Sequence, residues 1–398
     1  MRVQTTSAPM PETPGRPSDR RRLGGDPRAA GLILALLALG TPLWAQNPPD
    51  PSSATGPNDT IISRNDHVPL VIQWNPVIIA YAYLRVGDAR DYYDHHDGAF
   101  WHVCINDGQH LEIDVSDEPN PFGANWFYYP GIPFAGVDQP TLAQGAGLLL
   151  LVNRFSGPIY VYRTTDLLNG FYNQIGTVTA PGQEAYGAHS REGGSQNTYA
   201  YVVSARNDGS GFVILRIDGN MHTAQGAVSV ATNGLYSIRN GPYTFSETSG
   251  DPQDVLLSAD TDHLYIVATI QKPGGLCQRV YDVNHLYSVP FAPTVNGSQT
   301  FCWPGNDVWE GSVGQDVNGT VYVGANCSGP ALPLSMCWAT YGGSGALAVP
   351  RTSNSYIAGR IGDFTTMATD WRNGGQSMMM AAELVTNGVG ATAIQPIP

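Results

Sequence analysis

The sequence has very little positive charge, and its apolar runs are short. Among its 398 residues only Lys272 is a lysine, and 20 basic side chains stand against 33 acidic ones. Because a surface of this sign repels phosphate backbones, the composition argues against nucleic-acid binding. The uncharged apolar run at residues 29–40 is too short for a membrane span, which needs about 20 residues.

The first 45 residues are organised like a signal peptide. A basic segment that ends at Arg22 precedes the apolar residues 29–40, and Leu43-Trp44-Ala45 forms a suitable cleavage end. An uncleaved anchor is the alternative, because the basic segment is unusually long. Without residues 1–45, 14 basic and 30 acidic side chains remain, a net charge of −16. We therefore expect a secreted or periplasmic protein with no membrane span after cleavage.

Residues 46–60 (QNPPDPSSATGPNDT) are rich in Pro, Ser and Asn, a composition typical of a disordered leader. The folded domain is then expected to span residues 61–398. Within it, short β-branched and aromatic runs alternate with Gly, Asn, Asp and Pro, and helical periodicity is almost absent. The sequence therefore predicts an all-β protein.

Five cysteines in an exported chain favour disulfide bonds. Cys277 with Cys302 and Cys327 with Cys337 are near in sequence, so each pair can close a loop. Cys104 lies in an apolar run and is predicted to be a buried core side chain. No C-x-x-C motif occurs, which argues against a thiol redox role.

One sequence unit recurs along the folded part. It consists of a short strand of small or polar residues, a turn of Asp, Asn and Gly, and a strongly apolar strand. Six copies are found at residues 91–106, 138–153, 186–205, 254–269, 310–326 and 363–383. A period of about 50 residues is typical of propeller blades. We predict a β-propeller of six blades, each with four antiparallel strands; five or seven blades, paired β-sandwiches and a solenoid are the alternatives.

A propeller gathers the starts of its inner strands around one mouth of a central channel, and acids occur at every such start. Carboxylates crowded in this way must be solvated, paired, bound to a cation or partly protonated. The candidates for catalysis are Asp138, Glu310 and Asp363. The candidates for ligand binding are Asp91, His189, Asp254, Trp309 and Arg360.

Two of these acids have neighbours suited to acid–base chemistry. Glu310 follows Trp309, and an apolar ring beside a carboxyl group disfavours its charge. Asp363 has Arg360 three residues upstream as a counter-charge. One protonated acid and one ionised carboxylate are what a glycoside hydrolase uses. Each acid taken singly is also explained as an ordinary turn residue.

The stretch at residues 91–102 (DYYDHHDGAFWH) holds three His and three Asp and raises the question of a metal site. His95 and His96 are adjacent, so on a strand they point to opposite faces. We therefore predict a solvated turn and no metal site. No cofactor is expected, although calcium suits turn carboxylates better than zinc does.

Several short segments near the inner strands have a pattern known from one group of propellers. They are residues 115–117 (VSD), 138–140 (DQP), 153–155 (NRF), 162–167 (YRTTDL) and 360–365 (RIGDFT). In these segments the chain resembles secreted bacterial proteins with sialidase-like or arabinanase-like propellers. The resemblance implies the fold more than it implies a reaction.

The sequence favours a binding role. No nucleophile elbow, Walker loop or dinucleotide fingerprint stands between a strand and a helix. We expect a monomeric exported propeller that binds a carbohydrate or another extracellular ligand at the channel mouth. The alternative is an extracellular glycoside hydrolase that uses paired carboxylates.

Overall fold

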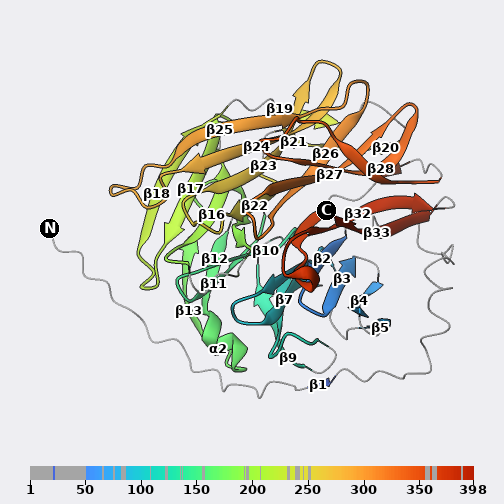
Figure 1. Ribbon diagram of the computed structural model, residues 1–398. Helices are drawn as coiled ribbons and strands as arrows, with labels where there is room; N and C mark the ends of the chain where they lie inside the picture. Colours follow the sequence, from blue (N-terminus) through green and yellow to red (C-terminus); the bar gives the residue numbers. More distant parts are fainter. Residues whose placement is uncertain are drawn as a thin grey trace.

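The structure is a computed structural model, and the strands that it describes form a closed ring of sheets (Figure 1). It describes residues 21–22 and 51–398, with gaps at 65–66, 75–76, 82–86, 108, 122–123, 135, 137, 155–156, 192, 194–196, 207, 231–233, 238–242, 245, 250–251, 355–358, 361–364 and 387–388. The predicted signal peptide, apart from Arg21 and Arg22, lies outside the described residues.

Seven blades follow one another along the described chain, and each runs from an inner to an outer strand. Blade 1 contains β2 (Ser52–Thr55), β3 (Asp59–Arg64), β4 (His67–Trp74) and β5 (Val77–Tyr81). Blade 2 contains β6 (Arg90–Asp94), β7 (Ala99–Asp107), β8 (His110–Ser116) and β9 (Asn125–Pro133). Blade 3 contains β10 (Thr141–Gly145), β11 (Leu148–Val152), β12 (Pro158–Arg163) and β13 (Gln174–Thr179). Blade 4 contains β14 (Gln183–Gly187), β16 (Ala200–Ala205), β17 (Gly211–Ile217) and β18 (Thr223–Ser229).

The second half of the ring has the same plan. Blade 5 contains β22 (Asp254–Leu257), β23 (Leu264–Lys272), β24 (Gly275–Asn284) and β25 (Thr294–Phe301). Blade 6 contains β26 (Asp307–Gln315), β27 (Val321–Gly329), β28 (Leu332–Thr340) and β29 (Ala348–Thr352). Blade 7 contains β31 (Thr366–Thr369), β32 (Met378–Thr386) and β33 (Val389–Ile397). All pairs within the blades are antiparallel, so this protein is an all-β propeller.

A few described elements lie outside this plan. β1 (Arg21–Arg22) pairs with β9, and β15 (His189–Ser190) pairs in parallel with β22. β19 (Gly234–Ser237) pairs with β21 (Ser246–Ser249), and β20 (Tyr243–Thr244) pairs with β30 (Gly359–Arg360). The helical segments include α2 (Thr164–Leu168) and η2 (Trp371–Asn373). Among the described residues, no helix is long and apolar enough to cross a bilayer.

The blade number differs from the six blades that the sequence predicts. The six repeat copies correspond to blades 2–7, and the additional blade is blade 1. Its inner strand β2 lies within the predicted leader, yet all four of its residues are buried. Inner strands require small residues, and a segment such as Ser-Ser-Ala-Thr has the same composition as a flexible linker. The folded domain therefore includes part of the predicted leader, and it begins before residue 61.

Apolar side chains from adjacent blades form the core between them. Phe100 and Trp126 of blade 2 pack with Ile61 of blade 1, for example, and Leu142 of blade 3 packs with Trp101 of blade 2. Similar clusters join blades 3 to 4, 4 to 5, 5 to 6 and 6 to 7. In Figure 1 the blue first blade lies beside the red last blade, which closes the ring. The strongly apolar strand β11 contributes to the clusters on both sides of blade 3, Leu149 and Leu151 to one and Leu148 and Leu150 to the other.

Inner strands approach one another so closely that only small residues fit at some positions. A Cβ atom on Gly187 in β14 would lie 2.5 Å from the carbonyl carbon of Leu142 in β10. A Cβ atom on Gly145 would lie 2.1 Å from the carbonyl oxygen of Tyr199. This crowding explains why the innermost strands are built from small residues, as the sequence predicts.

Most neighbouring inner strands are linked by side chains. In four blades, the side chain of the first residue of the inner strand accepts a hydrogen bond from a backbone N–H of the next blade. The acceptor and donor pairs are Ser52 with Asp91 (2.7 Å), Thr141 with Gly187 (2.9 Å), Asp254 with Val313 (2.9 Å) and Thr366 with Ser53 (3.1 Å). The last pair joins blade 7 to blade 1 and so closes the ring.

Both predicted disulfide pairs are present. Cys277 bonds to Cys302 with Cα atoms 4.6 Å apart, and Cys327 bonds to Cys337 with Cα atoms 6.2 Å apart. The first bond lies in blade 5 and the second in blade 6. Cys104 lies in β7 with no exposed surface, in agreement with its predicted place in the core.

We expect Thr366→Val to weaken the closure of the ring. Valine has nearly the same shape but accepts no hydrogen bond, so the buried Ser53 N–H loses its partner. The expected loss is about 1–3 kcal/mol of unfolding free energy, measured by urea denaturation. Thr177→Val is the matched control, since Thr177 is exposed on β13, an outer strand. Equal stability of the two variants would contradict the role of the Thr366 hydroxyl.

Asp59, the first residue of β3, is a buried acid. It has no exposed surface, and neither carboxylate oxygen has a hydrogen-bond partner among the described residues. Burial raises its pKa from 3.8 to about 6. Because the folded protein holds this proton more tightly than the unfolded chain does, the stabilisation is present below pH 4 and is lost as the pH rises through 6.

Asp59→Asn should remove this pH dependence. Relative to the wild type, the variant should gain up to about 3 kcal/mol of unfolding free energy between pH 4 and pH 7.5. Urea denaturation at the two pH values measures the difference. Asp107→Asn serves as the control. Hydrogen bonds from the Gln109 N–H and from His110 lower the pKa of the exposed Asp107 carboxyl, so this substitution should not give the gain in unfolding free energy expected for Asp59→Asn. Parallel pH profiles for wild type and Asp59→Asn would refute the assignment.

Candidate functional site

The inner strands of six blades, together with β15 after the inner strand of blade 4, line one cavity along the axis of the ring, which we call the channel cavity. Its volume is about 70 Å³. That is room for a few water molecules or one small polar group, and it is well below the ~300 Å³ of a pocket that encloses a drug-sized ligand. Its polar and aromatic lining includes Arg90, Asp91, Tyr92, Gln144, His189, Arg191, Asp254, Gln315, Thr369 and Trp371.

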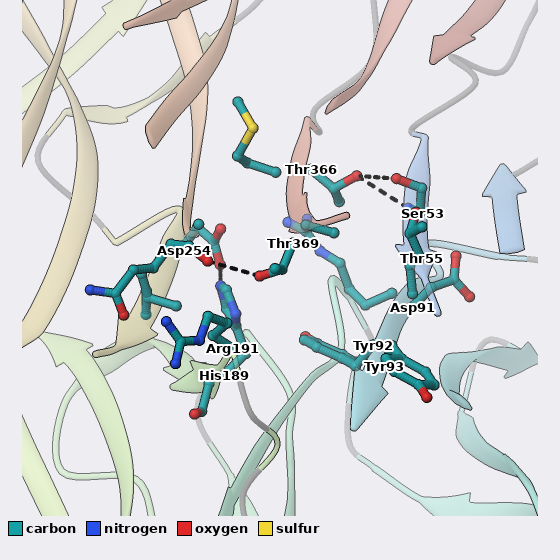
Figure 2. Close-up of a pocket in the computed structure, with 18 of the residues that line it drawn as sticks. Ser53, Thr55, Asp91, Tyr92, Tyr93, His189, Arg191, Asp254, Thr366 and Thr369 are labelled. Carbon is teal, nitrogen blue, oxygen red and sulfur yellow. Dashed lines mark hydrogen bonds and ion pairs between the residues drawn. The ribbon is translucent and has the colours of Figure 1, made fainter. Parts of the chain in front are cut away.

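An ion pair between His189 of β15 and Asp254 of β22, two paired strands, lies in the lining of the channel cavity (Figure 2). His189 Nε2 lies 3.1 Å from Asp254 Oδ1, and the other carboxylate oxygen accepts the Val313 N–H. Burial alone would raise the pKa of Asp254, but the charge and hydrogen bond of His189, together with the charge of Arg90, hold it below its usual value. Asp254 is therefore an ionised hydrogen-bond acceptor at neutral pH.

Two other lining residues have polar atoms for which the described protein offers no partner. Asp91 Oδ1 accepts from His102 Nδ1 (2.8 Å) and Ser63 Oγ (3.0 Å), whereas its Oδ2 has no partner. Gln144 Nε2 is likewise buried without a partner among the described residues. Buried polar atoms are nearly always hydrogen-bonded, to protein, water or ligand. One acceptor and one donor beside the channel cavity thus lack a partner within the described protein.

A second set of polar side chains, in the inner strands and the turns beside them, is linked by hydrogen bonds and charge, and we call it the mouth network. Its members are Gln139, Arg154, Glu184, Tyr186, Gln253 and Glu310. Arg154 forms an ion pair with Glu184, the Tyr186 hydroxyl donates to Gln139 Oε1 (2.7 Å), and Gln253 Nε2 donates to Glu310 Oε1 (3.0 Å).

Electrostatic coupling holds the mouth network together. Burial lowers the pKa of Arg154, but Tyr186, Glu184 and Glu310 more than offset this and raise it, so its charge is fixed. Burial raises the pKa of Tyr186, which keeps its hydroxyl protonated as a donor. The network therefore contains a permanent cation between two acids and has few unsatisfied groups.

The backbone at the mouth has an unusual repeated feature. Asp88, Gln139, Glu184 and Glu310 have positive φ angles of 39°, 40°, 51° and 50°. Each stands two residues before a corresponding inner-strand position, namely Arg90, Thr141, Tyr186 and Ser312. Non-glycine residues in this region cost about 1 kcal/mol or more each. The chain thus turns into the channel at the same point in four blades.

The structure brings together several of the residues that the sequence predicts as a site. Asp91, His189 and Asp254 all line the channel cavity. Glu310 is buried in the mouth network and accepts a hydrogen bond from Gln253, the neighbour of Asp254. Asp91, Asp254 and Glu310 lie in three different blades, and His189 lies in β15 beside the inner strand of blade 5, so residues far apart in the sequence converge.

Other predicted residues lie differently. Asp138 is half-buried, its N–H donates to Asn153 Oδ1 (2.8 Å), its carbonyl accepts from the Arg154 N–H (3.2 Å), and it does not line the channel cavity. Trp309 has no exposed surface, so its ring offers no face to a ligand in this conformation. Arg360 lies in β30, but its side chain is outside the described part of the chain. Asp363 lies outside the described residues altogether.

Several residues of the site are not among those predicted from the sequence. Gln144, Arg191 and Trp371 line the channel cavity, and Arg154 and Gln253 belong to the mouth network. Gln144 had a detectable signal, because it is the one long polar side chain in the small-residue strand Thr-Leu-Ala-Gln-Gly. Arg154 follows an apolar strand in a turn and gave no comparable signal.

The His- and Asp-rich stretch forms a turn at the end of β6. Ligand atoms of Asp94, His96 and Asp97 lie within 4.8 Å of one another. The Asp97 N–H donates to Asp94 Oδ1 (2.9 Å), and His96 Nδ1 lies 2.9 Å from Asp97 Oδ1. The stretch is a polar turn, as the sequence predicts, and the absence of a metal ion there stays a prediction.

The fold and the site together define a seven-bladed β-propeller with a polar central channel. No protein-family model matches the chain, and no curated protein matches it in sequence. The crystal structure of Saccharomyces cerevisiae Sqt1 is similar with a TM-score of 0.46 and 8% sequence identity, over 88% of this chain and 97% of that chain. The fold assignment rests on the strand order and register, and the resemblance to sialidase-like or arabinanase-like propellers stays a prediction.

Proposed function

We propose that this protein is an exported binding propeller that takes a polar group of a carbohydrate ligand into its channel cavity. The observation that carries the proposal is a pair of residues, Asp91 and Gln144, that line one cavity and each hold a buried polar atom without a partner in the described protein, Oδ2 and Nε2. Leaving such atoms unsatisfied costs about 1–3 kcal/mol each, so an occupant that satisfies them is favoured.

The chemistry of the lining suits hydroxyl groups. Arg90 and Gln144 supply N–H donors, whereas Asp91 and Asp254 supply carboxylate acceptors. A sugar hydroxyl both donates and accepts, so it can satisfy this mixed set, while a simple anion or cation matches only half of it. Trp371 and Tyr92 add aromatic faces beside the polar groups. The small volume of the cavity implies that one part of a sugar inserts and the rest lies outside.

Export is supported by the covalent structure. Two disulfide bonds in one chain are typical of oxidising compartments. Together with the predicted signal peptide, they favour a secreted or periplasmic location for this protein.

The geometry favours binding over glycoside hydrolysis. A glycosidase needs a carboxyl group that stays protonated, whereas the pKa of Asp254 is lowered and Glu184 is paired with the Arg154 cation. Hydrolysis would therefore depend on Glu310 and Asp363, and it is one outcome of the experiment below.

The test compares wild type with Gln144→Leu and Asp254→Asn on a glycan array, followed by calorimetry on each hit. We expect at least about a ten-fold weaker Kd for both variants, since each loses a hydrogen bond to the ligand. Gln144→Leu should keep or raise the melting temperature, because in the described protein its amide nitrogen has no partner to lose. Asp208→Asn, in an exposed turn of blade 4, is the charge-matched control and should bind normally.

Three outcomes would overturn the proposal. Unchanged binding in both variants would remove the channel cavity from the site. An absence of binding to any glycan would remove carbohydrate as the ligand class. Turnover of a chromogenic glycoside that is lost in Glu310→Gln or Asp363→Asn, with melting temperature preserved, would establish the hydrolase instead.

A further inference from the structure

Two consecutive aromatic residues are exposed on the outside of blade 3, and we call them the aromatic shelf. Phe171 is 65% exposed and Tyr172 is 50% exposed, in the turn that connects α2 to β13. Large aromatic side chains normally contribute to cores or interfaces. Their exposure in adjacent positions therefore needs an explanation.

The aromatic shelf is held in place by side chains of two blades. The Tyr172 ring lies 5.8 Å from that of Tyr129 in blade 2 and 5.5 Å from that of Tyr162 in blade 3. The hydroxyls of Tyr162 and Tyr172 are 3.2 Å apart, and the Tyr129 hydroxyl donates to the Leu167 carbonyl. Tyr172 is thus fixed by its neighbours, while one part of its surface stays open.

Polar groups stand next to the exposed rings. Asn173 Nδ2 donates to Asp166 Oδ2 at 3.1 Å, and Asn169 Nδ2 donates to the Thr165 carbonyl at 2.7 Å. Each amide and carboxylate retains further capacity for hydrogen bonds to solvent-facing groups. An open aromatic face flanked by amide and carboxylate groups matches a pyranose, which has an apolar C–H face and a rim of hydroxyls.

Tyr287, the other exposed aromatic residue of the described protein, belongs to a group of rings with a different explanation. Tyr199 and Phe291 enclose the Arg216 guanidinium, which lies 4.5 Å from each ring centroid and donates to the Leu286 carbonyl (2.7 Å). Tyr287 packs against Tyr199 there. These rings serve internal packing, whereas no described ring or cation covers Phe171.

The size of the aromatic shelf favours a sugar over a protein partner. At the exposures given above, the two side chains present on the order of 200 Å², because such rings bury roughly 150–250 Å² each when fully covered. A stable protein interface needs about 800 Å² on each partner. One or two sugar rings fit the smaller area, and the strongly acidic chain disfavours an anionic glycan.

We infer that the aromatic shelf is a second binding site, which takes a neutral pyranose of a polysaccharide independently of the channel cavity. Phe171 and Tyr172 stack on the C–H face of the sugar ring. Asp166 and Asn173 bind hydroxyls at its edge.

The test is affinity electrophoresis of the full chain in gels that contain neutral polysaccharides such as laminarin, xylan or hydroxyethylcellulose. We expect at least one of them to retard the wild type and Phe171→Ala to weaken that retention about ten-fold. Asp166→Asn should weaken it less. Val289→Ala, which shortens a side chain that is 87% exposed in blade 5, is the matched control and should bind like the wild type.

The outcomes separate the two sites. Asp254→Asn should keep a measurable retention, because it leaves the aromatic shelf unchanged; complete loss in this variant with an unchanged melting temperature would overturn independence. Equal losses in Phe171→Ala and Val289→Ala, or no retention of the wild type by any neutral polysaccharide, would overturn the inference. Retention only by acidic polygalacturonate would overturn the neutral ligand class. Each result stands whether or not the channel cavity binds a ligand.

Discussion

The rest of this structure depends on how the inner strands are held together at the axis. Neighbouring inner strands pack too closely for large side chains, yet most of them are not joined by a backbone ladder. Side chains at the first position of the strand accept the buried N–H groups of the next blade, as Ser52, Thr141, Asp254 and Thr366 do. Since an unpaired buried N–H is costly, these positions must be short and polar. The same requirement places polar atoms around the channel.

Because of this constraint, an acid that recurs at the starts of inner strands need not be functional. An acid at the start of an inner strand can be a structural acceptor, and Asp254 is one for Val313 while it also pairs with His189. Frequency alone therefore does not distinguish a structural acid from a functional one. What distinguishes them is whether their polar atoms have hydrogen-bond partners. Most polar atoms of the mouth network have such partners, whereas Asp91 Oδ2 and Gln144 Nε2 have none in the described protein. The unsatisfied atoms are the better indicators of a ligand.

The fold was predictable where local chemistry is specific and not where it is generic. Apolar strands after Gly- and Asn-rich turns identified blades 2–7, and loop-sized cysteine spacings identified both disulfides. Blade 1 was missed because Ser-Ser-Ala-Thr is indistinguishable by composition from a linker. Trp309 was misplaced because strand alternation does not tell whether a ring faces the channel or the neighbouring blade. The positive φ of Glu310 had no sequence signal, since no glycine marks it.

The two proposed sites belong to the same blade and so can act together. Gln144 of the channel cavity and Phe171 of the aromatic shelf both lie in blade 3, at opposite edges of its sheet, because β10 is the inner strand and β13 the outer one. A small cavity and a single stacking surface each give weak binding. When a long polysaccharide occupies both, the second contact forms at a high effective concentration, and the overall affinity exceeds that of either site. A propeller with a narrow channel can thus bind a polymer tightly without enclosing it.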